Sequence, residues 1–224
     1  MSAKKLKVIV TGATGMVGEG VLHECLMHPH VSEVLLVSRR TLNLKHEKLT
    51  ELLVPDFFDL SAIATELTDY DACFFCLGVS SVGMKEAEYR RTTYDLTMAF
   101  AELLCLQNPD MIFNYITGSG TDSSERGKSM WARVKGKTEN DLLRLPFRKA
   151  YMFRPGYIHP TPGLNNVHRY YRALSWMYPL LKLLFPGNTV TLREVGLAMI
   201  HTATRGYDSS ILSCSDIKKL ARAE

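Results

Sequence analysis

Apolar positions along the first two thirds of the chain form short continuous runs that alternate with longer stretches of helical spacing. Short apolar runs are typical of strands buried on both faces of a parallel sheet, and the longer stretches are typical of the helices that connect such strands. The runs predict strands at residues 5–11, 33–38, 49–55, 71–77, 111–117 and 149–155, and the stretches predict helices at 16–27, 60–67, 85–106 and 129–145. Six strands, each joined to the next by a helical crossover, predict a Rossmann-type α/β fold with a doubly wound parallel sheet.

The pattern changes after residue 155. Prolines and glycines in "GYIHPTPG" predict the end of regular structure there, followed by an apolar helix near 167–184 and then a short strand and a helix within 189–206. Insertions after the late strands of doubly wound folds usually border the substrate, so segment 156–190 is predicted to be a small substrate-side lid. With 224 residues the chain suits a single domain, residues 1–224, rather than two.

The composition narrows the function classes. Lysine and arginine together number 27 against 23 aspartates and glutamates, and the resulting charge of +4 is spread along the chain, so we expect no nucleic-acid partner. The most apolar stretch of the tail, 173–185, is interrupted by Pro179 and Lys182 and is too short to span a membrane, so no membrane span is expected. A membrane-surface or RNA-binding role would rest on the basic apolar stretch 168–185 alone.

The cellular compartment and metal binding can be judged from the five cysteines and from the position of the first predicted strand. The first predicted strand begins close to Met1 and leaves no room for a signal peptide, which indicates a cytoplasmic protein with free thiols. Cys73 and Cys76 have Cys-x-x-Cys spacing, but on a strand they point to opposite faces, and no second pair with zinc-like spacing accompanies them. We therefore expect core cysteines and no metal site.

Gly12, Gly15 and Gly18 follow the first predicted strand and open the first helix, in the sequence "TGATGMVGEG". Such a turn needs glycine to bend sharply, to approach a pyrophosphate closely and to pack the helix on the strand, and the helix start offers free N–H groups to phosphate oxygens. No Gly-Lys-Ser/Thr follows, which argues against a mononucleotide P-loop. The predicted pyrophosphate-binding residues are Gly12, Thr14, Gly15, Met16, Val17 and Gly18.

The end of the second predicted strand bears on which dinucleotide binds. NAD-selective folds place Asp or Glu there to accept hydrogen bonds from the ribose 2′-hydroxyl, whereas this chain has Ser38, Arg39 and Arg40. Arginine presents a planar fork of donors suited to phosphate, so the sequence predicts a preference for NADP(H), with NAD(H) also able to bind. The alternative is that both arginines simply face solvent.

Several stretches in order along residues 6–205 resemble one known superfamily. "TGATGMVG", "LLVSRR", "PDFFDL", "FFCLGVSS", "VKGKTE" and "FRPGYI" resemble the short-chain dehydrogenase/reductases, in their atypical and extended, epimerase-like branch of NAD(P)-binding proteins, and within it the Tat-interacting-protein type of oxidoreductase. The resemblance implies further cofactor-binding residues. Asp56 and Phe57 would border the adenine, Leu77 and Gly78 the ribose, Lys135 would bind the nicotinamide ribose, and Arg154, Pro155 and Gly156 would close the nicotinamide end.

The chain departs from the superfamily pattern at its usual catalytic pair, Tyr-x-x-x-Lys. Four residues before Lys135 stands Trp131, whose indole N–H can bond an oxygen but cannot relay a proton. Three explanations stay open: another phenol (Tyr115, Tyr157 or Tyr94) supplies the acid, the reaction is of another kind, or the protein keeps the dinucleotide as a sensor.

The substrate side carries weaker candidates. The superfamily that the chain resembles often carries Ser or Thr at the end of the fifth strand to hold the substrate oxygen, which implies Thr117 or Ser119 as a substrate donor here. Lys135 is the third catalytic candidate. His159 and His168 lie near the predicted lid and could titrate near neutral pH. The sequence thus predicts an NADP(H)-dependent oxidoreductase or epimerase-like enzyme acting on a small molecule that it does not identify, or else a non-catalytic dinucleotide sensor that acts through a protein partner. It also leaves a homodimer open.

Overall fold

The computed structural model describes residues 5–166, 178, 183 and 185–222. Its centre is a seven-stranded sheet in the order β3-β2-β1-β4-β5-β6-β9, in which neighbouring strands pair in parallel. The strands are β1 (Leu6–Thr11), β2 (Val31–Ser38), β3 (Leu49–Leu53), β4 (Ala72–Phe75), β5 (Ile112–Ile116), β6 (Lys149–Phe153) and β9 (Ile211–Leu212), and a separate parallel pair is formed by β7 (Tyr157–His159) and β8 (Thr189–Thr191). This order confirms the predicted Rossmann-type doubly wound fold.

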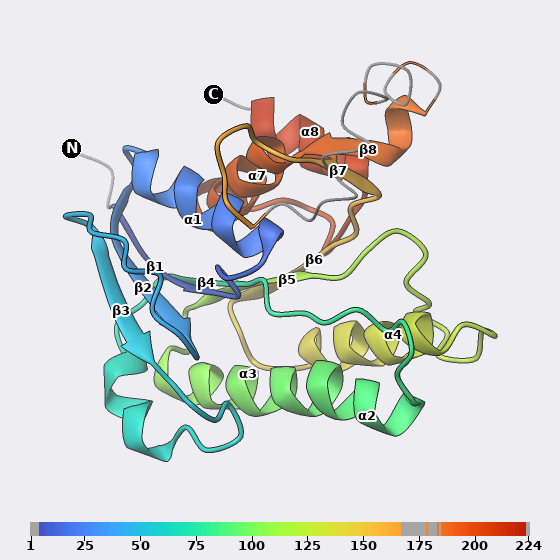
Figure 1. Ribbon diagram of the computed structural model, residues 1–224, viewed down its shortest axis with the longest axis horizontal. Coiled ribbons are helices and arrows are strands. Elements are labelled where there is room, and N and C mark those ends of the chain that lie inside the picture. Colours follow the sequence, from blue (N-terminus) through green and yellow to red (C-terminus); the bar gives the residue numbers. More distant parts are fainter. Residues whose placement is uncertain (1–4, 167–177, 179–182, 184, 223–224) are drawn as a thin grey trace.

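Helices cover both faces of the sheet (Figure 1). One layer contains α1 (Met16–Met27), α7 (Leu192–Arg205) and α8 (Cys214–Arg222), and the other contains α2 (Glu86–Arg90), α3 (Leu96–Gln107) and α4 (Met130–Leu142). Shorter helical segments are η1 (Ser61–Leu67) and η4 (Pro186–Asn188), both 3₁₀ helices, and the π-helical η2 (Arg91–Asp95), which links α2 to α3. The helix predicted at 85–106 is therefore present, with one π-helical turn inside it.

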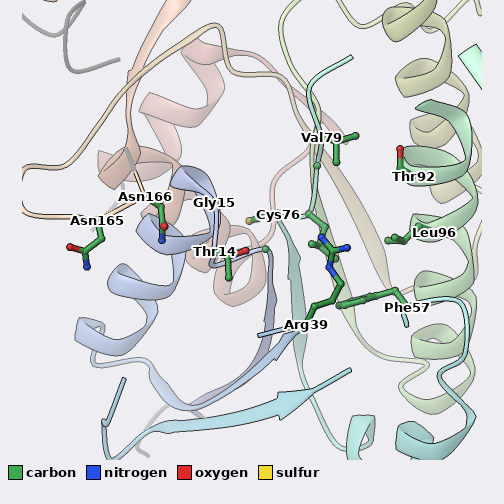
Figure 2. A pocket seen from close by; sticks show the side chains of 13 residues that line it. Thr14, Gly15, Arg39, Phe57, Cys76, Val79, Thr92, Leu96, Asn165 and Asn166 are labelled. Atoms are coloured by element: carbon green, nitrogen blue, oxygen red, sulfur yellow. The ribbon is translucent and has the colours of Figure 1, made fainter. Parts of the chain in front are cut away.

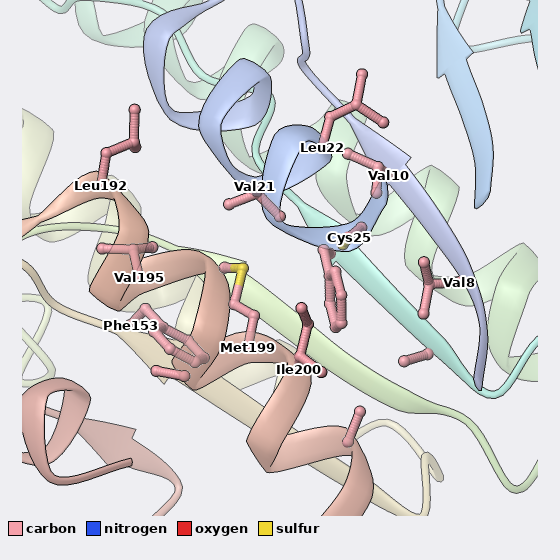
Figure 3. Packing of buried hydrophobic residues seen from close by; sticks show 14 of the residues in the cluster. Val8, Val10, Val21, Leu22, Cys25, Phe153, Leu192, Val195, Met199 and Ile200 are labelled. Atoms are coloured by element: carbon pink, nitrogen blue, oxygen red, sulfur yellow. The ribbon is translucent and has the colours of Figure 1, made fainter. Parts of the chain in front are cut away.

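Two apolar cores lie on the two faces of the sheet because successive strand residues point to opposite sides. On β1, Val8 and Val10 pack toward α1 and α7, whereas Ile9 packs toward α3. Figure 3 shows the first core, in which Val21 of α1 faces Val195 and Met199 of α7. The two cores hold the strand ends in fixed positions, and the site described below is built on those ends.

Three sequence expectations about the fold are wrong. The connection between β2 and β3, residues 39–48, contains no helix: it is a loop whose Thr41 hydroxyl and Leu42 N–H donate to the carboxylate of Glu51, at 2.6 and 3.2 Å. Regular structure also continues past residue 155, because β7 finds a partner in β8. Finally, the sequence prediction stopped short of β9 and α8, since β9 is two residues long and leaves almost no periodic pattern to detect.

The predicted lid, 156–190, falls only partly within the described residues. Its β7 and β8 ends are described, but the apolar helix expected near 167–184 and His168 lie outside them, apart from Tyr178 and Leu183. Within the described part of the chain, no helix is long and apolar enough to cross a membrane.

Candidate functional site

A cavity of about 580 Å³ opens at the carboxyl ends of β1, β2 and β4 (Figure 2). This is the point where the strand order reverses on either side of β1, which is where ligands bind in open doubly wound sheets. The volume is typical of a cofactor or small-molecule pocket. Its lining consists of Gly12, Thr14, Gly15, Arg39, Phe57, Cys76, Leu77, Gly78, Val79, Thr92, Leu96, Asn165 and Asn166.

The three glycines of the first turn serve different purposes. Gly12 has a φ of +74°, and a Cβ there would lie 2.5 Å from the Cys76 carbonyl oxygen. A Cβ on Gly18 would lie 2.3 Å from the Gly12 carbonyl oxygen, so both positions need glycine for the fold itself. At Gly15, by contrast, the nearest atom to an added Cβ is the Gly12 oxygen at 3.4 Å, and the residue lines the cavity. The protein could therefore hold a side chain at Gly15, and glycine there leaves room for a ligand.

The N-terminus of α1 faces this cavity without a cap. The helix begins at Met16 after Gly15, and among the described residues no side chain caps it. The first-turn N–H groups and the positive end of the helix dipole are therefore available to an anion. Met16, Val17 and Gly18 form this first turn of α1 and are not part of the cavity lining. These features fit the pyrophosphate of a dinucleotide.

Arg39 follows β2 directly and lies on the cavity wall, opposite Asn165 and Asn166 (Figure 2). The described lining contains no carboxylate, and within the described residues Arg39 forms no ion pair. Arg40 is exposed and outside the lining, and its main-chain carbonyl oxygen accepts a hydrogen bond from the Ser38 hydroxyl at 2.7 Å. Of the two predicted arginines, only Arg39 is placed to meet a ligand in this cavity.

Three of the four residues expected beside the adenine and ribose lie on the cavity wall, and one does not. Phe57, Leu77 and Gly78 line the cavity. Asp56 does not: it is exposed, and its Oδ1 accepts a hydrogen bond from the Phe58 N–H at 2.9 Å, which stabilises a local turn.

The other predicted site residues gather around the end of β5, on the side of α4. Lys135 Nζ donates a hydrogen bond to the Thr117 carbonyl oxygen at 2.7 Å. Burial lowers the pKa of Lys135 to about 8, and the Glu139 carboxylate partly opposes that shift. This hydrogen bond holds the Lys135 amine beside the carboxyl end of β5. Lys135 is nevertheless outside the cavity lining.

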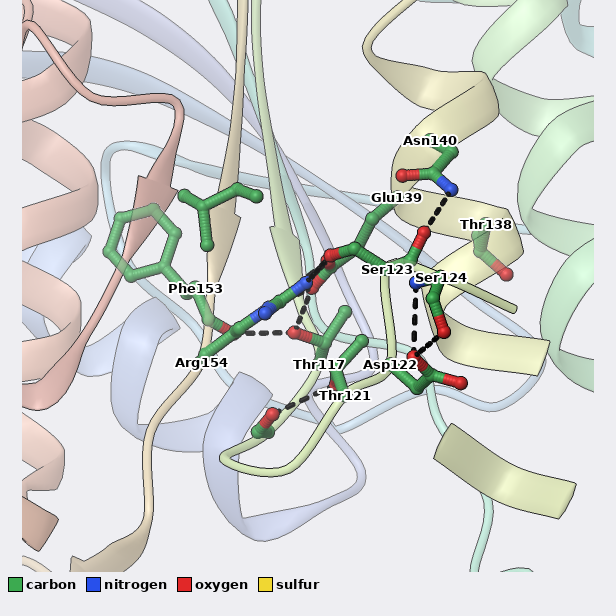
Figure 4. Close-up of polar contacts among 12 residues, drawn as sticks. Thr117, Thr121, Asp122, Ser123, Ser124, Thr138, Glu139, Asn140, Phe153 and Arg154 are labelled. Carbon is green, nitrogen blue, oxygen red and sulfur yellow. Dashed lines mark hydrogen bonds and ion pairs between the residues drawn. The ribbon is translucent and has the colours of Figure 1, made fainter. Parts of the chain in front are cut away.

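A buried polar network ties β5, β6 and α4 together here (Figure 4). Glu139 is fully buried, and the guanidinium of Arg154, directly after β6, binds both of its carboxylate oxygens. Thr117 Oγ1 lies 2.6 Å from Glu139 Oε1 and 3.0 Å from the Phe153 carbonyl oxygen. Both neighbours are acceptors, so the single proton of the Thr117 hydroxyl is already committed within the protein.

The loop after β5 contains the remaining substrate candidate. Ser119 is exposed, and its N–H donates to the Pro155 carbonyl oxygen at 2.8 Å, which brings the loop beside the end of β6. Gly156 is close to the chain before β8, since an added Cβ would lie 2.2 Å from the Asn188 carbonyl oxygen. Of the three candidates Lys135, Thr117 and Ser119, only Ser119 presents a hydroxyl to solvent.

The structure limits the search for a replacement acid. Trp131 lies one turn before Lys135 on α4, with its ring 3.4 Å from the position of a Cβ on Gly120. Tyr115 is sealed in the core, and burial holds the pKa of its phenol far above the usual range. Tyr94 Oη donates to Asp141 Oδ2 at 2.7 Å. Tyr157 is half-buried on β7, where burial raises the pKa of its phenol.

Burial shifts the pKa values of His159 and of the Cys-x-x-Cys pair, Cys73 and Cys76. The His159 ring stacks on Tyr178 with centroids 3.9 Å apart, and burial lowers its pKa. Cys73 packs in the core toward α3 and Cys76 against the core toward α1, as expected for residues three apart on a strand. Burial raises the pKa of both thiols, which is typical of unreactive core cysteines.

Sequence reasoning missed nearly half of the cavity wall. The missed residues are Cys76, Val79, Thr92, Leu96, Asn165 and Asn166. Cys76 and Val79 flank the predicted pair at 77–78 and could have been found by extending that stretch by one residue at each end. The others come from the helix after β4 and from the segment after β7, which reach the cavity only through the tertiary fold.

Known proteins of similar fold bind dinucleotides. MoeE5 in complex with UDP-glucuronic acid and NAD superposes with a TM-score of 0.66 at 17% identity, over 96% of this chain and 81% of that one. Bordetella bronchiseptica WbmF, in complex with NAD+ and UDP, gives 0.65 at 16% identity over 96% and 76%. Protein HTATIP2 of Rattus norvegicus is 29% identical over 178 residues, which is 75% of this chain and 72% of the relative.

Fungal relatives overturn the expected cytoplasmic location. The Aspergillus terreus protein fmp52-1, 28% identical over 69% of this chain and 67% of its own length, is named a mitochondrial protein. Candida albicans FMP52, 22% identical over 97% and 99%, has the same designation. The expectation was wrong because the position of the first strand specifies the fold, and a folded domain of this kind can work in any compartment.

The match to a family model covers most of the residues at the glycine turn and part of the residues on the α4 side. Residues 8–138, more than half of the chain, match the NAD dependent epimerase/dehydratase family. They include the glycine turn, Arg39 and the α4 pair Trp131 and Lys135. The chain therefore belongs to the NAD-dependent epimerase/dehydratase family.

Proposed function

We propose that this protein binds NADP(H) in the cavity above β1, β2 and β4, in preference to NAD(H), and acts as an oxidoreductase or epimerase-like enzyme on a small molecule. The placement of Arg39 carries the proposal. Its guanidinium stands at the end of β2, on a cavity wall whose described residues include no carboxylate, and it has no competing ion pair among them. A planar donor fork in this position favours a ribose 2′-phosphate over a free 2′-hydroxyl.

Different residues of the cavity would contact different parts of the dinucleotide. The turn Gly12–Gly15 and the start of α1 would hold the pyrophosphate, Arg39 the 2′-phosphate, and Phe57 with Leu77 and Gly78 the adenosine side. The bound cofactor would supply hydride transfer. Lys135 would orient the nicotinamide ribose from the α4 side, and the exposed Ser119 hydroxyl, in the loop beside the end of β6, would donate to a substrate oxygen.

Calorimetric titration with NADPH and with NADH tests this proposal, with Arg39→Ala as the variant and Arg40→Ala as its matched control. We expect wild type to bind NADPH more tightly, and Arg39→Ala to weaken NADPH binding by about tenfold or more, as expected for one lost charge-assisted contact, while NADH binding changes little. Arg40→Ala should leave both affinities near wild type, because Arg40 lies outside the cavity lining. Equal binding of the two cofactors, unchanged by Arg39→Ala, would refute the preference.

A second candidate function is a non-catalytic dinucleotide sensor that acts through a protein partner. Two observations favour it. Trp131 stands where the superfamily pattern has tyrosine, and the Thr117 hydroxyl is bound to Glu139. A panel of carbonyl substrates with NADPH separates the two functions. Turnover above the solvent background that Trp131→Tyr leaves unchanged would favour an enzyme using another acid, and no turnover despite bound cofactor would favour the sensor.

A further inference from the structure

The segment 160–166, here called the strap, crosses the start of α1 after leaving β7. It contains two of the cavity residues, Asn165 and Asn166 (Figure 2). The strap lies about 150 residues along the chain from the glycine turn that it covers, so some interaction must hold it there. Glu19, in the first turn of α1, provides that interaction.

Glu19 binds the strap with both of its carboxylate oxygens. Oε1 accepts a hydrogen bond from the Asn165 N–H at 2.8 Å, and Oε2 accepts one from the Asn166 N–H at 2.7 Å. Two consecutive main-chain N–H groups on one carboxylate make a charge-assisted pair whose geometry fixes the strap in register with the helix.

Further contacts make the strap a defined element. Asn166 Nδ2 donates to the Ala13 carbonyl oxygen within the glycine turn at 3.3 Å, and Leu164 packs against the core on the α1 side. Pro160 and Pro162 restrict the backbone before Gly163, whose φ of +90° makes the turn. Little conformational freedom is left for the strap to lose when a ligand binds.

The negative charge of Glu19 is unexpected at the start of a helix that faces the proposed pyrophosphate site. A carboxylate in the first turn of the helix that receives a pyrophosphate should repel it, and by charge alone Glu19 should weaken cofactor binding. Its hydrogen bonds to the strap, however, hold one side of the cavity wall in place.

We infer that Glu19 is a positioning residue for the dinucleotide: it fastens the strap across the glycine turn, so that Asn165 and Asn166 enclose the bound cofactor and slow its release. This inference rests on the proposed dinucleotide binding. Removing the Glu19 anchor should therefore raise the dissociation rate of the cofactor, whereas an effect of charge alone should lower it.

Stopped-flow measurement of NADPH release is the test, on wild type, Glu19→Ala and Glu19→Gln. Glutamine keeps the size of the side chain, but its amide nitrogen cannot accept the second N–H. We expect both variants to release NADPH about tenfold faster than wild type, with a melting temperature close to wild type. The control is Glu102→Gln, which removes the same charge from an exposed position on α3.

Two further measurements keep the inference independent of a single variant. Asn166→Ala, which removes the contact to Ala13 and leaves α1 intact, should speed release in the same direction but less. Amide exchange at Asn165 and Asn166 should quicken in the Glu19 variants even without cofactor, since Glu19→Ala removes the acceptor of both N–H groups and Glu19→Gln removes the acceptor of one. Release at or below the wild-type rate in both Glu19 variants, with wild type binding NADPH, would overturn this inference alone. Failure of wild type to bind either dinucleotide would overturn the proposed function as well.

Discussion

The two groups of predicted site residues differ in where their polar atoms point. At the glycine turn, the uncapped start of α1 and the side chain of Arg39 face a cavity and have no described partner in the protein. At the α4 side, Lys135 donates to the Thr117 carbonyl oxygen, and the Thr117 hydroxyl and the Arg154 guanidinium both bind Glu139. The first group is arranged for a ligand, and the second is arranged largely for the protein itself.

This difference matters because cofactor binding and proton transfer place different requirements on the protein. A dinucleotide site requires mainly backbone geometry, which the strand, turn and helix provide whatever the substrate is. Proton transfer requires a titratable side chain near the reacting atom, and Trp131, four residues before Lys135, cannot supply one. Under the proposed function, the chain would keep its cofactor site while its reaction changes or is lost.

The largest effect is expected from breaking the α4 network. Arg154→Met should leave the fully buried Glu139 carboxylate without its cation, which costs about 3–5 kcal/mol of unfolding free energy. NADPH affinity measured where the variant is still folded should change little, because Arg154 is outside the cavity lining. Chemical denaturation and calorimetric titration of the same sample give both values.

The double variant Glu139→Gln with Arg154→Met is the control for this experiment. Removing the buried charge along with its partner should recover most of the lost stability. A large loss of NADPH affinity in Arg154→Met alone would contradict the comparison, and would instead favour the role implied by family resemblance, in which Arg154 closes the nicotinamide end.

A smaller effect is expected at the glycine turn, where alanine at Gly15 and alanine at Gly12 should affect different properties. Gly15→Ala should preserve the fold, since its Cβ would meet only the Gly12 oxygen at 3.4 Å, yet it should weaken NADPH binding by about tenfold or more by entering the ligand space. Gly12→Ala should lower the unfolding free energy by about 2 kcal/mol or more, because it combines a positive φ with a clash against Cys76. Thermal denaturation and NADPH titration of the two variants check this, and equal losses of stability would contradict it.

The sequence could predict the elements that depend on local patterning. The helix at 16–27 was predicted with its observed bounds, because a strand, a turn and a helix start leave local signals. The same signals led to Gly12, Gly15 and Arg39, which line the cavity. The loop between β2 and β3 was misjudged, since a parallel pair usually needs a helical crossover.

The α4 network could not be predicted, because it depends on distances between elements far apart in the chain. Thr117 and Arg154 both looked like ligand-binding residues, and nothing local shows that Glu139 lies between them. Asn165 and Asn166 reach the cavity for the same reason: a glutamate on α1 holds them there. Sequence motifs report which side chains are available, and the tertiary fold decides whether they face a ligand or each other.

The smallest and most local effect concerns Lys135, which belongs to the α4 side but keeps a titratable group. Burial lowers its pKa to about 8 from the ordinary 10.5, so at pH 8 the folded protein should hold about a hundredfold more neutral amine at this position than the unfolded chain does. Between pH 8 and 10.5 the unfolded state retains this proton while the folded state has lost it. The contribution of Lys135 to stability therefore rises with pH across that window.

Reductive methylation followed by mass spectrometry should show this titration directly. The pH midpoint for modification of Lys135 should lie near 8 in the folded protein and near the ordinary value in the same protein unfolded in urea. Glu139→Gln should lower the folded midpoint further, because the Glu139 carboxylate favours the charged ammonium. Bound NADPH should slow the modification if Lys135 reaches the nicotinamide ribose. A midpoint near 8 without protection by NADPH would instead mean that Lys135 contacts only the protein. Lys135 would then belong, like Thr117 and Arg154, to the group of residues whose polar atoms bind the protein itself.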